Sequence, residues 1–260
     1  MPLEMLLGII AVGAIGGYLG GIVGAGIGAT VVPSLILFGI DPTVAIGSSL
    51  LLHTLISPLG GAYHYRLGHV HRKIFLPMAL AGMLGAFSGA NITTQLPSKE
   101  LKLLVGVSTM GAGLSIVVKF PKPKNDTHHK LKELVKRLRG PKFRSIALIG
   151  LIAGLSHGAL GTGWGPLGVP LLILAGTSPQ TAVGSSLLAR VFISLVGSST
   201  YFTLIGLPLD IVLPLLIGGS IAMIIGASTA KRLYPKTLKH IVGIVAVVLG
   251  VLVLAKQVVT

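Results

Sequence analysis

Long apolar segments that are nearly free of charge dominate this sequence. Short polar loops separate them, and only 10% of all residues are Asp, Glu, Lys or Arg. A segment of about 20 apolar residues matches the thickness of the hydrocarbon core of a bilayer. We therefore expect an all-α integral membrane protein. The apolar segments are residues 3–23, 29–40, 43–65, 74–92 and 101–118, followed by 145–160, 166–175, 180–204, 211–228 and 238–255.

The basic residues gather in the loops between these segments. The net charge is +15, and ten of the 21 Lys and Arg residues lie between Lys119 and Arg144. Nucleic-acid-binding surfaces combine basic and aromatic side chains on one folded face, a pattern that this chain lacks. Basic clusters in loops beside membrane segments are instead typical of cytoplasmic loops. The charge therefore argues against nucleic acid and for a lipid bilayer as the partner.

The two halves of the chain repeat each other at an offset of 137 residues. Gly24–Gly28 (GAGIG) matches Gly161–Gly165 (GTGWG), and Gly47–Leu51 is identical to Gly184–Leu188 (GSSLL). The same register holds from residue 21 to residue 89, which indicates a duplicated unit. We expect a first membrane repeat at residues 1–120, a basic connector at 121–142 and a second membrane repeat at 143–260.

The second apolar segment of each half, 29–40 and 166–175, is too short to cross a bilayer as a regular helix. Each is either a half-helix completed by extended backbone or an arm of a re-entrant hairpin, and both need surrounding protein or water. If these segments cross, each half has five crossings and the repeats are inverted; if they re-enter, the repeats are parallel. With the connector in the cytoplasm, five crossings put 17 basic residues inside and three outside, against 14 and six for four crossings. The positive-inside rule therefore favours inverted repeats.

The connector itself is polar, basic and bounded by Pro121 and Pro141. We interpret it as a solvated cytoplasmic loop that sets the orientation of the chain and is attracted to anionic lipid. A regulatory or partner-binding role is the alternative.

Few polar side chains lie inside the apolar segments, and the repeat pairs two of them. Arg190 lies near the middle of segment 180–204, and His53 occupies the same depth in segment 43–65. Ionisable groups inside a membrane are costly and mark functional sites. The segments provide no central Asp or Glu for Arg190, so we interpret it as the attachment point for an anion; satisfaction by backbone carbonyls and water is the alternative. Hydroxyl groups for the same site come from the matching serines Ser48, Ser49, Ser185 and Ser186, of which Ser49 and Ser186 share a helix face with His53 and Arg190.

Each glycine-rich turn opens one of the short segments. Alternating glycines permit positive φ angles and close approach of the backbone, and a helix start offers unpaired N–H groups with a partial positive charge. Two such starts at the bilayer midplane would hold an anion between the repeats, whereas tight helix packing is the alternative interpretation. The candidate ligand-binding residues of the turns are Gly24, Gly26, Gly28, Gly161, Gly163 and Gly165, together with Thr162, Trp164 and the nearby His157 as candidates for substrate selection.

The sequence offers no catalytic centre. The chain contains no cysteine, no nucleotide-binding loop and no nucleophile–base–carboxylate set within its apolar segments. The pair His128–His129 fits a solvated loop better than a metal site. We therefore expect no enzymatic activity, no cofactor and no metal.

A doubled motif runs through both halves. It consists of the Gly-x-Gly-x-Gly turn, a short helix with a proline and then Pro-x-x-Ala-x-Gly-Ser-Ser-Leu, and its last block is Pro42–Leu50 in the first half and Pro179–Leu187 in the second. This pattern resembles the TauE/SafE family of sulfite exporters over nearly the whole chain. The resemblance implies transport of small sulfur-containing anions, such as sulfite, sulfoacetate or sulfonates, across the cytoplasmic membrane.

The residues and the resemblance together predict a secondary transporter that exports a small sulfur-containing anion by alternating access between the two repeats. It would be a multi-pass protein of the cytoplasmic membrane, as a monomer or a homodimer. A passive anion channel, and a non-transporting membrane subunit that docks a partner through the basic connector, are the alternatives.

Overall fold

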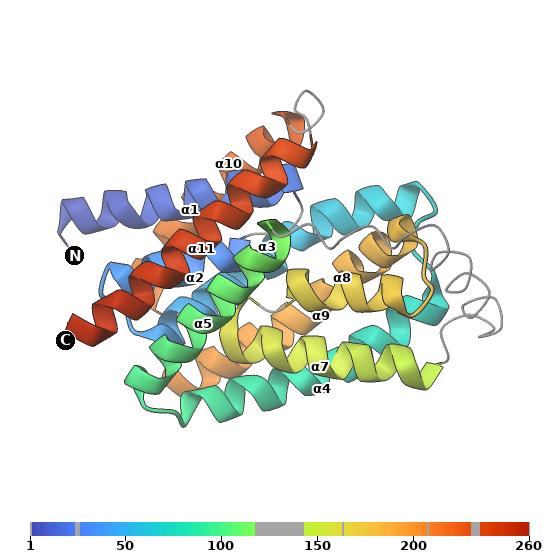
Figure 1. Ribbon diagram of the computed structural model, residues 1–260, viewed down its shortest axis with the longest axis horizontal. Coiled ribbons are helices and arrows are strands. Elements are labelled where there is room, and N and C mark those ends of the chain that lie inside the picture. Colours follow the sequence, from blue (N-terminus) through green and yellow to red (C-terminus); the bar gives the residue numbers. More distant parts are fainter. Residues whose placement is uncertain are drawn as a thin grey trace.

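The computed structural model describes residues 2–23, 27–117, 143–162, 164–206, 208–229 and 235–259 (Figure 1). These residues form helices joined by short turns, with no strand among them, so the expected all-α class is confirmed. The expected connector at 121–142 lies outside the described residues, as do Gly24, Gly26 and Gly163. The helices, numbered as in Figure 1, are α1 (Leu3–Val23), α2 (Ile27–Leu37), α3 (Pro42–Arg66), α4 (Arg72–Thr94), α5 (Ser98–Val117), α7 (Phe143–Leu160), α8 (Trp164–Leu174), α9 (Pro179–Ile205), α10 (Leu209–Thr229) and α11 (Pro235–Val259).

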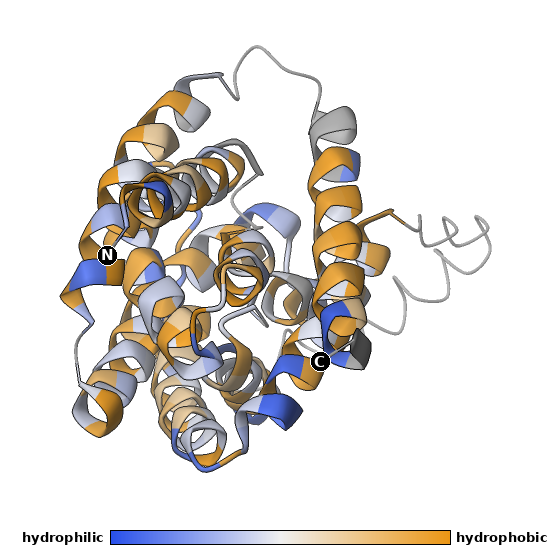
Figure 2. Ribbon diagram, turned by 90° about the vertical axis from the view of Figure 1, so that its left-hand side faces the viewer, coloured by the Kyte–Doolittle hydropathy of each residue, from blue (hydrophilic) through white to orange (hydrophobic). Residues whose placement is uncertain are grey.

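Eight of the described helices are long and apolar enough to cross a membrane. The other two, α2 and α8, have 11 residues each and are too short for a regular crossing. Large apolar side chains are exposed along the outer faces of the long helices, as expected where lipid is the solvent. Figure 2 shows that hydrophobic residues dominate the helices, with hydrophilic residues mainly at helix ends and in loops.

The two short helices end in the same way because a glycine stops each of them. Gly39 and Gly176 adopt positive φ angles of 88° and 93°. The following N–H groups reach back five residues, from Ile40 to the Leu35 carbonyl and from Thr177 to the Leu172 carbonyl. This is the Schellman arrangement, which satisfies carbonyl groups at a helix end. It ends α2 at Leu37, three residues earlier than the apolar pattern predicts.

The outer helix pairs join one half of the chain to the other. In α1 and α10, a Cβ atom added to Gly13 would lie 2.3 Å from the Leu215 carbonyl oxygen, and one added to Gly17 would lie 2.1 Å from that of Gly219. The two backbones are therefore in direct contact, and residue numbers rise in the same direction along both helices.

The pair α4 and α7 repeats this contact at positions 137 residues away. A Cβ atom on Gly150 would lie 2.5 Å from the Met78 carbonyl oxygen, and one on Gly154 would lie 2.2 Å from that of Gly82. These helices also run in parallel. Close approach at small residues is the usual means of helix association in membranes.

Two antiparallel crossings complete the arrangement. At the centre, α3 crosses α9, with Gly47 against Tyr201 and Gly60 against Leu187. On one side, α5 crosses α11 through Gly113, where an added Cβ atom would lie 2.6 Å from the Gly243 carbonyl oxygen. The long central helices α3 and α9 carry the polar residues that the sequence singles out.

Gly154→Ala should destabilise the protein, because the added methyl group would collide with the Gly82 backbone. Overpacking of this kind costs about 1–3 kcal/mol, so the thermal unfolding midpoint of the purified protein should fall. Gly111→Ala is the matched control, since its added Cβ would meet nothing within 4 Å. Alanine favours a helix more than glycine, so the control should be neutral or stabilising. An unchanged midpoint for Gly154→Ala would contradict the close packing.

Candidate anion-binding site

Arg190 and His53 lie in the buried centre of the protein, on the crossing helices α9 and α3. Each side chain is only 4% exposed. The Nε atom of Arg190 donates a hydrogen bond of 2.9 Å to the Ser57 hydroxyl, which lies one helical turn after His53 on α3. Neither α3 nor α9 contains Asp or Glu. The helix crossing thus brings a guanidinium group and an imidazole into the buried interior, on two helices that carry no carboxylate.

His157 from α7 joins these two side chains. Its ring lies edge-on to that of His53, with ring centres 5.1 Å apart, and a 2.9 Å hydrogen bond links its Nε2 atom to the Ser194 hydroxyl on α9. The buried Trp164 ring follows at 6.1 Å from His157. We refer to Arg190, His53, His157, Ser57 and Ser194 as the central cluster.

Several buried polar atoms around the central cluster have no hydrogen-bond partner among the described residues. They include the Nδ1 atom of His157, the indole Nε1 of Trp164 and the hydroxyl group of Ser49. The buried hydroxyl of Ser48 also has no partner among the described residues, but it lies five residues before His53, on another face of α3. Buried polar groups are normally hydrogen-bonded, and those that are not call for a specific explanation such as a bound water or ion. A hydrogen-bonding ligand or water at this place would satisfy them.

His53 is held in one orientation by its own helix. Its Nδ1 atom donates a 2.8 Å hydrogen bond to the Ser49 carbonyl oxygen. In the neutral ring the proton on Nδ1 leaves Nε2 as an acceptor. The Ser49 hydroxyl stays unused, so it remains able to bind a ligand or a water molecule.

The matching serines in the second half have different surroundings. Ser185 accepts a hydrogen bond from the backbone N–H of His71, at 3.1 Å, and Ser186 donates to the Val183 carbonyl of its own helix. The position 137 residues after His71 is Pro208, which has no N–H group to offer. This difference explains why the hydroxyl of Ser48 has no such donor although its counterpart Ser185 does.

The two glycine-rich turns meet each other. A Cβ atom on Gly28, at the start of α2, would lie 2.0 Å from the Gly161 carbonyl oxygen. Gly161 has a φ angle of +67° and ends α7, with its N–H bonded to the His157 carbonyl at 2.8 Å. Thr162 is buried next to it, and Gly165 lies in the first turn of α8. The first turn of α2 therefore packs on the backbone that leads into α8.

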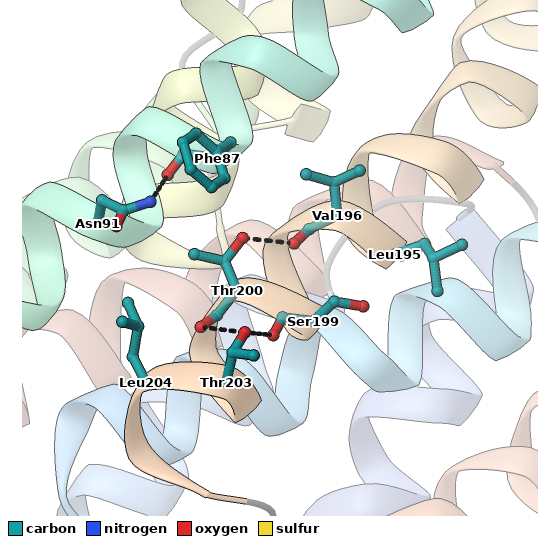
Figure 3. Close-up of a pocket in the computed structure, with 8 residues that line it drawn as sticks. All are labelled: Phe87, Asn91, Leu195, Val196, Ser199, Thr200, Thr203 and Leu204. Atoms are coloured by element: carbon teal, nitrogen blue, oxygen red, sulfur yellow. Dashed lines mark hydrogen bonds between the residues drawn. The ribbon is translucent and has the colours of Figure 1, made fainter.

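A pocket lies elsewhere, away from the central cluster. It is a groove of about 570 Å³ between α4 and α9, lined by Phe87, Asn91, Leu195, Val196, Ser199, Thr200, Thr203 and Leu204 (Figure 3). Two of its polar groups are engaged within their own helices: the Asn91 amide donates to the Phe87 carbonyl and the Thr200 hydroxyl to the Val196 carbonyl, both at 2.8 Å. Arg190 and His53 do not line this groove.

A smaller cavity lies beside α7. It has a volume of about 230 Å³ and is lined by Ser108, Gly111, Ala112, Ser115, Ser156, Thr162 and Leu167. Ser156 precedes His157 on α7, and Thr162 lies two residues before Trp164. Of the residues that the sequence analysis proposes for the site, Thr162 lines this cavity, while Arg190 and His53 are enclosed by protein.

Ser57 and Ser194 are not among the site residues predicted from the sequence. A signal for them is nonetheless present, because Ser57 follows His53 by four residues and Ser194 follows Arg190 by four, which places each on the face of its neighbour. Tyr201, whose buried hydroxyl donates to the Gly158 carbonyl at 3.0 Å, carries no comparable signal.

Ser57→Ala should destabilise the protein, because it removes the acceptor for the Nε–H group of the buried Arg190. Loss of a hydrogen bond to a buried charged group costs about 1–3 kcal/mol, which a lower thermal midpoint of the purified protein would register. Ser228→Ala is the matched control, since that exposed hydroxyl bonds only to its own helix. Equal midpoints for the two variants would contradict the importance of this contact.

Comparison with known proteins identifies the family. The family model described as sulfite exporter TauE/SafE matches residues 9–253. The probable membrane transporter protein YtnM of Bacillus subtilis (strain 168) is 26% identical over 247 residues, covering 93% of this chain and 80% of that protein. A probable membrane transporter protein of Xylella fastidiosa (strain Temecula1) is 28% identical over 260 residues, covering 98% and 97%. No solved structure matches the chain. The chain belongs to the TauE/SafE sulfite exporter family of membrane transporters.

Proposed function

We propose that this protein is a secondary carrier that exports a small sulfur-containing anion, such as sulfite, sulfoacetate or a sulfonate. The observation that carries the proposal is the buried guanidinium group of Arg190 on helices without Asp or Glu. Arginine keeps its charge in proteins, and a charge inside a membrane is expensive unless it serves a function. An anion that binds beside Arg190 would offset this charge.

Neutral polar groups favour an oxyanion as the ligand. The hydroxyls of Ser48 and Ser49 and the Trp164 indole N–H are buried and lack hydrogen-bond partners among the described residues. Sulfite and sulfonate groups carry several oxygen atoms that accept hydrogen bonds, and ionised acceptors form stronger bonds than neutral ones. The choice of a sulfur oxyanion over other oxyanions follows the description of the family.

Inverted repeats supply the mechanism that we propose. Helix α1 is parallel to α10, and α7 is parallel to α4. Helix α4 is also parallel to α9, as Gly82 lies against Ile193 and Gly197 against Ala86. A loop of three residues joins α9 to α10, so these two long helices run in opposite directions.

These directions support inverted repeats, because α1 and α7, which hold the same place in the two halves, would then run in opposite directions. Inverted repeats around a central site allow alternating access by rocking of one unit against the other. The basic connector would lie in the cytoplasm, because this orientation puts the most Lys and Arg residues inside.

Arg190→Gln should abolish transport, because the amide keeps the polarity of the side chain and removes its charge. Purified protein in liposomes would be tested for saturable uptake and counterflow of sulfite, sulfoacetate, taurine, thiosulfate and sulfate. Arg144→Gln, at the exposed start of α7, is the matched control and should retain wild-type rates. The anion that the wild type transports should also raise its thermal midpoint, since ligand binding stabilises the folded state, and Arg190→Gln should lose this shift.

The outcomes distinguish the alternatives. Unchanged uptake by Arg190→Gln would contradict the assignment of the site. An ohmic current without saturation or counterflow would contradict a carrier and indicate an anion channel. Deletion of residues 122–140 should leave transport intact; if the wild type transported none of the anions, the proposed function would be wrong and a docking role of the connector would remain.

A further inference from the structure

The cavity of about 230 Å³ lies between α5, α7 and α8, and we call it the α5–α7–α8 cavity. Its wall on α5 consists of Ser108, Gly111, Ala112 and Ser115, which are small or hydroxylated. These positions lie on the second half of α5, the half that leads into the connector. Its other walls come from Ser156, Thr162 and Leu167. The volume has room for several water molecules.

Gly111 shows that the space beside α5 is open. A Cβ atom added to this residue would meet nothing within 4 Å, whereas one added to Gly106 or Gly113 would press against α11. The two faces of α5 therefore differ: one packs tightly and the other borders the cavity. The hydroxyls of Ser108 and Ser115 donate to carbonyls of their own helix, so their oxygen atoms can accept hydrogen bonds from water.

The corresponding face of α11 carries aliphatic side chains that suit contact with lipid. The residues that lie 137 positions after the α5 wall are Val245, Val248, Leu249 and Leu252. Val248 and Leu252 are 50% and 47% exposed, so aliphatic side chains cover this surface. The serine and glycine residues in the same places on α5 offer little apolar surface for contact with lipid. They suit a wall that faces water.

The two halves also differ in how closely the short helices are covered. Helix α11 packs against α2 more extensively than α5 packs against α8. The Lys256 ammonium group donates a 2.9 Å hydrogen bond to the carbonyl of Leu37, the last residue of α2. Leu19 and Thr30 are buried in the first half, whereas their counterparts Ser156 and Leu167 are half-buried beside the cavity. Neighbouring helices therefore cover α2 tightly, whereas a cavity borders α8.

We propose that the α5–α7–α8 cavity is the aqueous path by which the anion reaches the central cluster from the connector side of the membrane. The proposal rests on the proposed function for the identity of the solute. Ser108, Ser115 and Ser156 line the path, and Thr162 lines it at the link between α7, which carries His157, and α8, which begins at Trp164. His157 and Trp164 each have a buried polar atom that lacks a partner among the described residues. The path contains no acidic side chain, so it does not repel an anion.

Thiol labelling tests whether water reaches the cavity, because the natural chain contains no cysteine. Ser115→Cys is nearly isosteric, and Leu252→Cys is the matched control on α11. Membrane vesicles with the connector face outward would be treated with 2-sulfonatoethyl methanethiosulfonate, a membrane-impermeant sulfonate. Thiolates react and thiols in lipid do not, so we expect modification of Ser115→Cys to be at least about tenfold faster. Unfolding in detergent should make both residues fully reactive.

Three results would overturn the proposal. Equally slow labelling of both variants would show that Ser115 faces lipid. Faster labelling of Ser115→Cys in vesicles of the opposite orientation would place the opening on the wrong side. Rapid oxidation of Ser115→Cys to a disulfide-linked dimer would show that the small residues of α5 pack against a second copy of the chain.

A cavity-filling variant tests the path in transport. Gly111→Leu adds a side chain to open space, so the protein should keep its thermal midpoint while its anion uptake falls sharply. Val248→Leu, at the matching position of α11, should transport normally. Normal uptake by Gly111→Leu would overturn the proposal. Fast labelling of Ser115→Cys in a protein that transports none of the anions would support the aqueous path and refute the proposed function, so the two failures are distinguishable.

Discussion

Direct backbone contact between helices of the two halves is the constraint on which the rest of the structure depends. In a bilayer, apolar side chains gain little by leaving lipid for one another, so helices associate through close packing and hydrogen bonds. Glycines at matching places in α1, α4, α7 and α10 bring carbonyl oxygens against neighbouring Cα atoms, as at Gly17 and Gly154. These outer pairs flank the antiparallel crossing of α3 and α9. Because that crossing places Arg190 opposite Ser57, the geometry of the polar centre follows from the packing of residues that carry no side chain.

The side chains of the polar centre are buried, yet several polar atoms near them make no hydrogen bond among the described residues. Arg190 and the two imidazoles of His53 and His157 are buried, and Ser57 and Ser194 hold two of these side chains in place. Hydroxyl and indole groups nearby have no partner among the described residues. This enclosure supports the proposed carrier, which would have to hold its solute away from water at one stage of its cycle.

Differences between the halves are as informative as their similarity. Pro208 in the place of His71 leaves the Ser48 hydroxyl without the backbone donor that Ser185 has. Serine and glycine on α5, in the places of valine and leucine on α11, border a cavity instead of lipid. For the proposed carrier with inverted repeats, we expect the two halves to exchange roles between the two access states, so that any one state would be asymmetric. The closed surroundings of α2 and the open surroundings of α8 fit one such state.

The sequence by itself determined the all-α membrane class, the helices to within a few residues and the family, because apolar length, turn-forming glycines and a doubled motif are local properties. It also singled out Arg190 and His53, since ionisable residues are rare inside apolar segments. Tertiary structure alone decided that Ser57 is the hydrogen-bond partner of Arg190, that His157 joins the cluster from α7 and binds Ser194, and that the serines of the second half are engaged elsewhere. Such contacts join residues up to 133 positions apart. They depend on the angle and register at which helices cross, and close backbone packing sets both only once the chain has folded.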